Sequence, residues 1–329
     1  MSDHAATLKP DAAELEQHFE HYRRELIAHC YRMLGSPFEA EDAVQETFIR
    51  AWRAYDSFEG RAALRSWLYR IATNVSLDML SGKERRARPM DLGPAQEPVM
   101  ANLHARDEAT WLQPIPDALV APADESPEAV AVTHDSIRLA FVAALQHLPP
   151  KQRAALILCE VLRWQASEAA ELLDTSVASV NSALQRARAT LEATKIPATP
   201  ATLSTDDRAL LERYVAAFEA YDIDALTGLL HEDATQSMPP FDLWLEGRDD
   251  IFTWWFGPGI ACQGSRVVPA VGANGSPAFG QYKPSPDGGY EPWALQVVEF
   301  EDGKIVELTF FLDTATLFPL FGLPPRLEA

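Results

Sequence analysis

The sequence predicts a multidomain chain: two all-α domains followed by an α+β domain whose curved sheet forms a cone. Apolar residues recur at the helical period up to about Gly82, and again from about Asp135 to Ala193. A proline-rich stretch without such a period separates these two segments. After Pro200, short helical patterns give way to runs of β-forming residues. Helices followed by an antiparallel sheet are typical of an α+β fold, and 329 residues suffice for several cores.

Charge is distributed very unevenly along the chain. The formal net charge is −20, which by itself argues against a protein that binds nucleic acid, because that affinity comes largely from phosphate neutralisation. However, residues 61–88 hold seven Lys or Arg against two acids, a local charge of +5, whereas residues 200–329 hold seven basic and twenty acidic residues, a local charge of −13. Only the first of these segments is suited to DNA.

Several function classes are disfavoured by what the chain contains. We find no stretch of about 18 apolar residues and no basic segment followed by an apolar run at the N-terminus. The three cysteines, Cys30, Cys159 and Cys262, are scattered and lack the spacing of metal ligands. We therefore expect a cytoplasmic protein with reduced cysteines and without a membrane segment, a metal or a cofactor.

The first domain, residues 12–88, is predicted to contain three helices. A first helix ends at Gly35-Ser36-Pro37, and a second runs from Glu39 to about Tyr55. The inward stripe of the second helix is predicted to be Val44, Phe48, Ala51, Trp52 and Tyr55, which leaves a largely polar opposite face. A polar loop, 56–62, precedes the third helix, whose inward residues are Leu64, Leu68, Ile71, Val75 and Met79.

The outer face of the third helix carries Trp67, Arg70 and Asn74, with Arg65 and Tyr69 nearby. Aromatic rings stack on unpaired bases, amides bond base edges and arginines hold phosphates, so this mixture favours single-stranded DNA recognition. Packing of the aromatic residues at the rim of the domain is an equally simple explanation.

Taken together, residues 40–80 resemble the second conserved region of small extracytoplasmic-function sigma factors, which initiate bacterial transcription. The resemblance implies that the D-x-x-Q-E-x-F pattern binds the β′ clamp coiled coil of core RNA polymerase, and that W-L-Y-R-I-A-x-N reads the melted minus-10 promoter element. The implied polymerase-binding residues are Asp42, Gln45, Glu46, Phe48 and Arg50. The implied minus-10 residues are Phe58, Arg65, Trp67, Tyr69, Arg70, Asn74, Arg85 and Arg86.

Residues 89–134 are predicted to be a partly extended, acidic linker, because seven prolines fall between positions 89 and 127. One apolar cluster, Trp111 to Pro116, interrupts it. Such a cluster either docks on a surface of this chain or of the polymerase, or is a local apolar cluster within the linker that contacts nothing else.

The second domain, residues 135–196, carries a predicted helix-turn-helix. Ser167 is expected to cap its first helix and Ser176 its recognition helix. Inward positions of the recognition helix are Val177, Val180, Leu184, Ala187 and Leu191. The residues left for DNA are Ser176, Ser179, Asn181, Ser182, Gln185, Arg186 and Arg188.

This second domain resembles the fourth sigma region, which contacts the minus-35 element. It departs from the family at Val180-Asn181-Ser182-Ala183-Leu184, where V-K-S-R-L is usual, and residues 163–199 carry no net charge. Weaker phosphate anchoring by this domain is expected.

The third domain, residues 202–329, is predicted to begin with helices, the first capped by Ser204, and to continue with strands near 266–271, 277–283, 293–301 and 304–313. Asp302-Gly303 is a strong hairpin signal. The order resembles SnoaL-like domains of the nuclear-transport-factor-2 superfold, notably at His231–Ala234 and Glu246–Ile251. The resemblance implies an apolar pocket in the cone, lined by Met238, Trp244, Trp255, Phe256, Trp293, Phe311 and Asp313, for a small-molecule ligand.

The expected function is therefore a sigma factor rather than an enzyme, whose acidic third domain regulates it in cis. That domain would either shield the minus-10 helix or fix the spacing of the two DNA-binding domains. One rival is a repressor that binds duplex DNA without polymerase. Another is an enzyme that uses His231, Asp233 or Asp313 as acid and base, with the helical half as a partner module.

Overall fold

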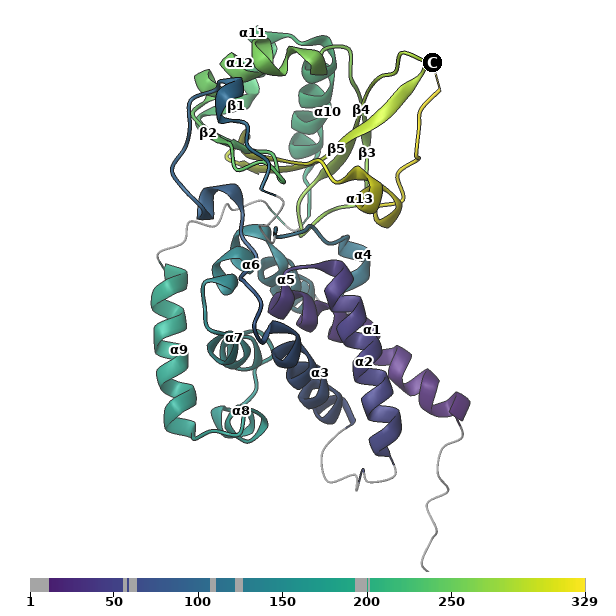
Figure 1. The fold of residues 1–329 in the computed structure, drawn as a ribbon, viewed down its shortest axis with the longest axis vertical. Coiled ribbons are helices and arrows are strands. Elements are labelled where there is room, and N and C mark those ends of the chain that lie inside the picture. Colours follow the sequence, from purple (N-terminus) through teal and green to yellow (C-terminus); the bar gives the residue numbers. More distant parts are fainter. Residues whose placement is uncertain are drawn as a thin grey trace, which may run out of the picture.

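In the computed structural model, two helical domains form one body, and an α+β domain is stacked on it (Figure 1). The structure describes residues 12–55, 58, 64–106, 111–121, 127–192, 200 and 202–328. The loop predicted at 56–62 and the junction at 193–199 lie almost entirely outside these residues. The fold class predicted from the sequence is confirmed.

The first helical domain is a bundle of α1 (Ala12–Leu34), α2 (Pro37–Ala54) and α3 (Leu64–Leu80). Gly35 ends α1 in the left-handed region at φ +72°, a conformation that glycine adopts without strain. The hydroxyl of Ser36 then caps α2 by accepting from the backbone N–H of Glu39 at 3.4 Å. The turn predicted at Gly35-Ser36-Pro37 is therefore confirmed.

Residues 81–106 and 111–121 leave this bundle and contact the C-terminal domain. They include the 3₁₀ turns η2 (Pro89–Asp91) and η3 (Met100–Asn102) and the short helix α4 (Asp117–Val120). The N–H of Gln96 donates to the Trp244 carbonyl at 3.0 Å, and the N–H of Asp242 donates to the His104 carbonyl at 3.0 Å. In its described residues the linker is bound along the domain rather than suspended between domains.

The second helical domain is arranged around a helix-turn-helix. Its elements are α5 (Pro127–Ile137), α6 (Leu139–Gln146), α7 (Pro150–Leu156), the π-helix η4 (Ile157–Val161), α8 (Ala166–Leu172) and α9 (Val177–Glu192). Helix was predicted only from about Asp135, so the expected linker boundary falls inside α5. The reason is that Pro127 is compatible with the first turn of a helix and is followed by good helix formers.

The C-terminal domain is a six-stranded sheet with helices on both of its faces. Its helices are α10 (Thr205–Ala220), α11 (Ile223–Leu229), α12 (Arg248–Phe256), the 3₁₀ helix η5 (Pro258–Cys262) and α13 (Thr314–Leu320). Its strands are β1 (Leu230–Ser237), β2 (Trp244–Glu246), β3 (Arg266–Pro269), β4 (Ala278–Pro284), β5 (Tyr290–Glu301) and β6 (Lys304–Phe311).

The strand order is β2-β1-β6-β5-β4-β3, and β1 runs parallel to β6 while the other pairs are antiparallel. The hairpin predicted at Asp302-Gly303 is confirmed, with both residues at positive φ. Strands β1 and β2 were not predicted, because the polar run from His231 to Asp233 lacks the alternation of a half-buried strand.

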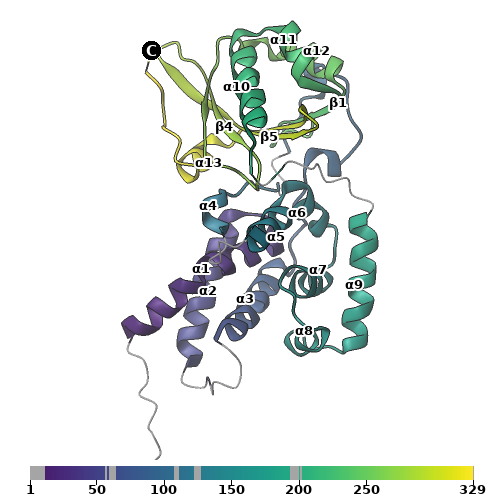
Figure 2. The ribbon, with the colours of Figure 1, turned by 180° about the vertical axis from the view of Figure 1, so that it is seen from behind.

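Two hydrophobic cores hold the molecule together. One lies between α10, α12 and the inner face of the sheet and contains Phe218, Trp255 and Phe310. The other begins in the helical domains and continues into the C-terminal domain, where it includes Val297 and Phe318. Figure 2 shows this stacked arrangement from behind. The second core contains apolar residues of both the helical domains and the C-terminal domain. The domains are therefore packed against each other and not merely connected by the chain.

Candidate nucleic-acid and polymerase interfaces

One face of α2 combines the predicted polar residues with exposed apolar ones. Asp42 and Gln45 are exposed. Phe38, Ile49 and Trp52 are 37%, 45% and 50% exposed, and their spacing places all five side chains on one stripe. Trp52 was predicted to be buried, which is wrong. Its exposure, with that of Phe38 and Ile49, was missed because apolar residues in a helix were assigned to the core.

Glu46, Arg50 and Phe48 take other places in the bundle. Arg50 donates to the Glu46 carboxylate at 2.7 Å and to Asp78 of α3 at 2.9 Å, so it ties α2 to α3. The ring of Phe48 stacks on that of Phe19 at 5.3 Å and packs against the core. Phe48 therefore lies inward, as the stripe predicted for α2 has it, and its implied contact with polymerase stays a prediction.

The outer face of α3 carries an aromatic cluster next to polar groups. Trp67 is half-buried, and its ring lies 4.8 Å from that of Phe58 and 6.4 Å from that of Tyr55. Asn74 is exposed on the same helix. Arg70 is also exposed, but its guanidinium pairs with Glu171 of α8 at 2.7 Å. Two of the predicted minus-10 residues are thus accessible, and a third is engaged within the chain.

Tyr69 does not belong to that surface. It is 1% exposed, its hydroxyl donates to Glu25 at 3.2 Å, and Arg65 lies over its ring while donating to the same carboxylate at 2.7 Å. Burial raises the pKa of Tyr69, which keeps its hydroxyl neutral. In this closed arrangement Tyr69 is not available to DNA, because its side chain faces α1 and the ring of Trp164 lies beside it.

The basic segment that follows α3 is divided between solvent and the linker. Arg85 is exposed. Arg86 is only 12% exposed, donates to the Trp111 carbonyl at 2.7 Å and pairs with Glu39 at 3.0 Å. Arg86 therefore fixes the linker to the first domain in this arrangement, while the exposed Arg85 contacts the ring of His147 in the second helical domain.

All seven residues predicted to read duplex DNA are exposed on or beside α9. The Ser176 hydroxyl accepts from the N–H of Ser179 at 3.1 Å, so the predicted cap of the recognition helix is confirmed. Two details are corrected. Val177 is 43% exposed because it lies in the first turn, outside the bundle. The start of α8 is closed by a capping box of Gln165 and Glu168 rather than by Ser167.

The missing cation at Ala183 has a structural explanation. Ala183 is 8% exposed and belongs to the core, so an arginine would not fit there without displacing its neighbours. Asn181 is exposed and has room for a lysine. Arg188 pairs with Glu160, which further lowers the positive charge that α9 offers to DNA.

The two predicted DNA-binding elements lie against each other. The Arg70–Glu171 ion pair joins α3 to α8, and the ring of Trp164 lies 6.0 Å from that of Tyr69. Both views show α3 beside α7 and α8 (Figures 1 and 2). The first and second helical domains therefore form a single closed unit.

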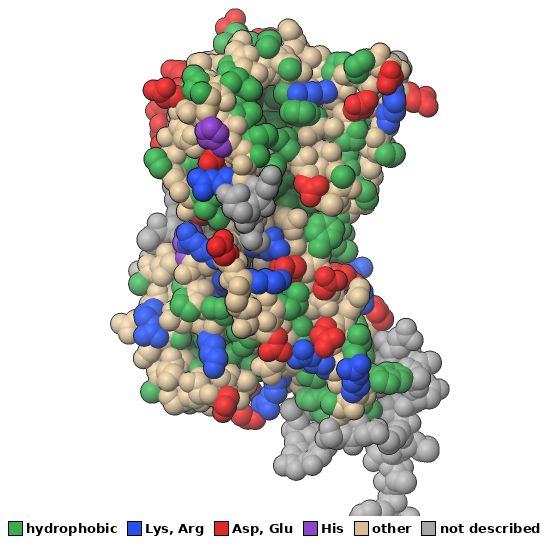
Figure 3. Space-filling view, viewed as in Figure 1, with side chains coloured by type: hydrophobic (Ala, Val, Ile, Leu, Met, Phe, Trp, Pro, Cys, Tyr) green, Lys and Arg blue, Asp and Glu red, His purple; other side chains and the backbone are tan. Residues whose placement is uncertain are grey.

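The residues predicted to line one pocket in the cone are dispersed. Trp255 lies in the core and donates to Gln236 at 2.6 Å, and Met238 packs against the same core. Trp293 and Phe256 are 39% and 36% exposed. Trp244 lines a cavity of about 360 Å³, whereas Phe311 and Asp313 line another of about 570 Å³. The prediction that they share one pocket is wrong, although Figure 3 shows hydrophobic side chains gathered in a hollow of this domain.

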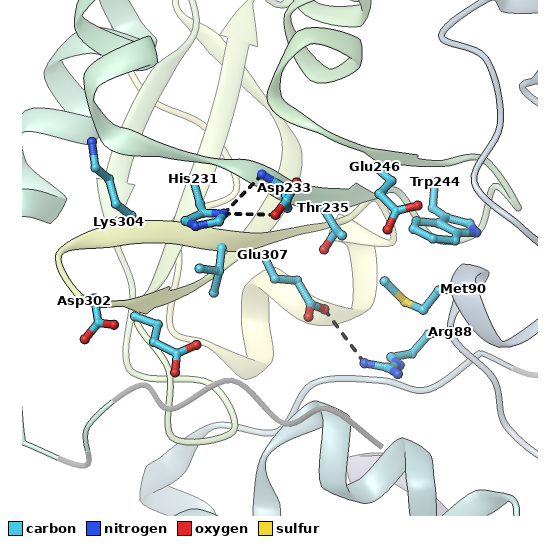
Figure 4. A pocket seen from close by; sticks show the side chains of 12 residues that line it. Arg88, Met90, His231, Asp233, Thr235, Trp244, Glu246, Asp302, Lys304 and Glu307 are labelled. Atoms are coloured by element: carbon cyan, nitrogen blue, oxygen red, sulfur yellow. Dashed lines mark hydrogen bonds and ion pairs between the residues drawn. The ribbon is translucent and has the colours of Figure 1, made fainter. Parts of the chain in front are cut away.

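His231 and Asp233 project from β1 into the cavity that also contains Trp244 (Figure 4). The N–H of Asp233 donates to Nδ1 of His231 at 3.1 Å, and the two side chains are 4.0 Å apart. Across the cavity Arg88 lies 3.9 Å from Glu307, and burial raises the pKa of Glu307 although the guanidinium of Arg88 opposes this shift. Asp313 lies in the other cavity and accepts from Thr316 at 2.5 Å.

A helical bundle, a helix-turn-helix domain and an appended α+β domain are also what comparison with known proteins finds in this chain. Residues 18–86 match Sigma-70 region 2, residues 138–191 match Sigma-70 region 4, and residues 211–308 match a SnoaL-like domain. The ECF RNA polymerase sigma factor SigG of Mycobacterium tuberculosis is 45% identical over 95% of this chain and 85% of its own. The chain belongs to the ECF RNA polymerase sigma factors.

Two further similarities concern SigJ of the same organism. Its sequence is 31% identical over 66% of this chain and 62% of its own. The crystal structure of the Mycobacterium tuberculosis extracytoplasmic function sigma factor SigJ matches with a TM-score of 0.60 and 22% identity, over 94% of this chain and all of that one. At that identity the match supports the fold. Among the described helices, none is both long and apolar enough to cross a membrane.

Proposed function

We propose that this protein binds core RNA polymerase through the exposed stripe of α2 and directs initiation at promoters. In this proposal α3 reads the melted minus-10 element through Trp67 and Asn74, and α9 reads the minus-35 element. The observation that carries it is the α2 stripe, which combines exposed apolar and exposed polar side chains in a member of the sigma family. Because core RNA polymerase works in the cytoplasm, this proposal also places the protein in the cytoplasm.

The present arrangement is closed with respect to such a promoter. Elements at minus 10 and minus 35 are about 25 base pairs apart, or roughly 85 Å at 3.4 Å per base pair. In this structure α3 and α8 are joined by an ion pair of 2.7 Å. The two helical domains cannot reach both elements of a straight duplex in this state, so promoter binding requires them to separate.

The C-terminal domain holds the closed state through Asn274. This residue is fully buried at the tip of the β3–β4 connection. Its side chain accepts from the N–H of Ile115 in the linker at 2.9 Å and donates to the Tyr31 hydroxyl at 2.7 Å and the Ile137 carbonyl at 2.5 Å. One side chain thereby joins the linker, α1 and α5.

A buried ion pair adds a second connection. Arg138, between α5 and α6, donates to Glu299 of β5 at 2.5 Å, and both side chains are less than 10% exposed. The hydroxyl of Ser276 donates to the same carboxylate at 2.7 Å. We infer that the C-terminal domain regulates the sigma factor in cis, by holding its two DNA-binding domains together.

We infer also that the C-terminal domain acts without catalysing a reaction. His231 and Asp233 are 45% and 81% exposed and contact each other on β1. Asp313 lines a different cavity, so the three ionisable candidates do not converge on one site. Electrostatic and acid–base catalysis require such convergence.

Run-off transcription with bacterial core polymerase and genomic fragments tests both inferences. We expect specific initiation by the wild-type chain, and the same yield within twofold from the triple variant His231→Ala, Asp233→Ala, Asp313→Asn. Full-length protein is preferable to a fragment ending at Ile196, because removal of the C-terminal domain would expose the core that it shares with the helices. If no transcript starts with any fragment, the sigma function is wrong; if only the triple variant fails, the domain has a chemical role.

A further inference from the structure

A second cavity lies at the seam between the linker and the C-terminal domain. Its volume is about 570 Å³, within the range of small-molecule sites, which often occur at domain interfaces. One wall comes from the linker, residues 106 and 111–113, and the other from the β1–β2 loop, the end of β6 and α13. We call this the seam cavity. It is separate from the core of the cone, to which Trp255 and Phe310 belong.

The walls of the seam cavity are mainly apolar and aromatic. Trp111 from the linker, Phe241 from the β1–β2 loop and Phe311 from β6 all line it. Flat aromatic surfaces from three segments favour a ring system, which can stack on one of them and meet the edge of another. The apolar lining therefore selects an aromatic molecule over a flexible polar one.

The charged residues of the cavity do not favour a charged ligand. Arg106 donates through Nε to Asp242 at 2.9 Å, and its half-exposed side chain retains terminal N–H donors within the described part of the chain. Asp313 contributes a carboxylate to the same cavity. With one guanidinium and one carboxylate in its lining, the cavity offers no net charge that would favour an ion over a neutral molecule. An uncharged molecule suits both side chains if it carries a carbonyl that accepts a hydrogen bond from Arg106 and a hydroxyl that donates one to Asp313.

The seam cavity depends on contact between the first helical domain, to which part of the linker is bound, and the C-terminal domain. Its linker wall is fixed to the first helical domain, because the N–H of Leu112 donates to the Ala87 carbonyl at 3.0 Å and the N–H of Gln113 donates to the Gly35 carbonyl at 3.1 Å. Its other wall belongs to the C-terminal domain. Movement of the first domain away from the C-terminal domain would pull the walls apart. A molecule bound between them stabilises the closed state by mass action.

We propose that the seam cavity binds an uncharged aromatic molecule bearing carbonyl and hydroxyl groups, and that the bound molecule keeps the sigma factor closed. The proposed binding site is inferred from the cavity and its lining residues alone. The effect of the bound molecule on transcription initiation rests on the proposed function. The ligand would thus act as a co-inhibitor that is released when the chain engages polymerase and promoter.

Nile red, an uncharged aromatic carbonyl compound with environment-sensitive fluorescence, is a suitable probe with the full chain. We expect saturable binding by the wild type and at least tenfold weaker binding by Asp313→Trp, which fills the cavity from its rim. The matched control Asp233→Trp places the same residue in the other cavity and should bind as the wild type does. Leu312→Trp fills the seam cavity from another side and should also weaken binding at least tenfold. This second variant keeps the test valid if Asp313→Trp fails to fold.

Equal binding by the wild type, Asp313→Trp and Leu312→Trp would overturn the site. Addition of core polymerase and promoter DNA should release the probe from the wild type. Retention of the probe in a transcribing complex would overturn the link to opening. A chain that binds the probe as expected but never initiates transcription would show the proposed function to be wrong while leaving the site in place.

Discussion

Replacement of Glu299 by leucine is expected to lower the free energy of unfolding by about 3–5 kcal/mol, because it leaves the buried guanidinium of Arg138 without its carboxylate. The same change should shift the chain toward the open state, since Arg138 and Glu299 connect the second helical domain to the sheet. Urea unfolding measures the first effect, and promoter affinity in the presence of core polymerase measures the second.

A double variant separates the charge from the packing. Arg138→Met with Glu299→Leu removes both charges from the same buried site and should recover most of the lost stability, because two apolar side chains need no ionic partner. Glu212→Leu, on the exposed face of α10, is the matched control and should change stability by less than about 0.5 kcal/mol. If Glu299→Leu is as stable as this control, the ion pair does not hold the domains together.

Replacement of Trp52 by alanine is expected to weaken binding to core polymerase by about 2 kcal/mol or more, roughly thirtyfold, without changing the stability of the free chain. Trp52 is 50% exposed at the end of the α2 stripe, and large aromatic residues flanked by polar ones carry much of the affinity of protein interfaces. Binding of the full chain to immobilised core polymerase measures the effect.

Trp293→Ala provides the matched control for that measurement. Trp293 is 39% exposed on β5 and lies under the ammonium of Lys283, far along the chain from the α2 stripe. The control should bind core polymerase as the wild type does. Equal affinities for Trp52→Ala and the wild type would remove α2 from the proposed interface.

The order and class of the domains could be predicted because each rests on local signals. The cap at Ser36, the cap at Ser176 and the Asp302-Gly303 hairpin are determined by residues within a few positions of each other, and all three are confirmed. Helical periodicity likewise separated inward from outward positions along most of α3 and α9. Where neighbouring residues determine the structure, the sequence was sufficient.

The predictions and the structure differ where distant segments determine what a side chain contacts. Tyr69 was assigned to DNA because its neighbours are exposed, but in the closed arrangement α1 and Trp164 cover it. Trp52 was assigned to the core because it is apolar, but no helix covers that face among the described residues. The pocket of the cone was assembled from residues that lie in the core, at the surface and in two separate cavities. Asn274 was missed altogether, because a buried hydrogen-bond hub in a loop has no pattern of its own.

Energy transfer between the two helical domains tests the closed arrangement most directly. A donor and an acceptor would be attached at Ser81→Cys and Ala189→Cys, two exposed positions, after replacement of the partly exposed Cys159 and Cys262 by serine. We predict efficient transfer in the free chain and its loss, to a separation approaching 80 Å, once core polymerase and promoter DNA are bound. Efficient transfer that persists in a complex producing transcripts would contradict the account.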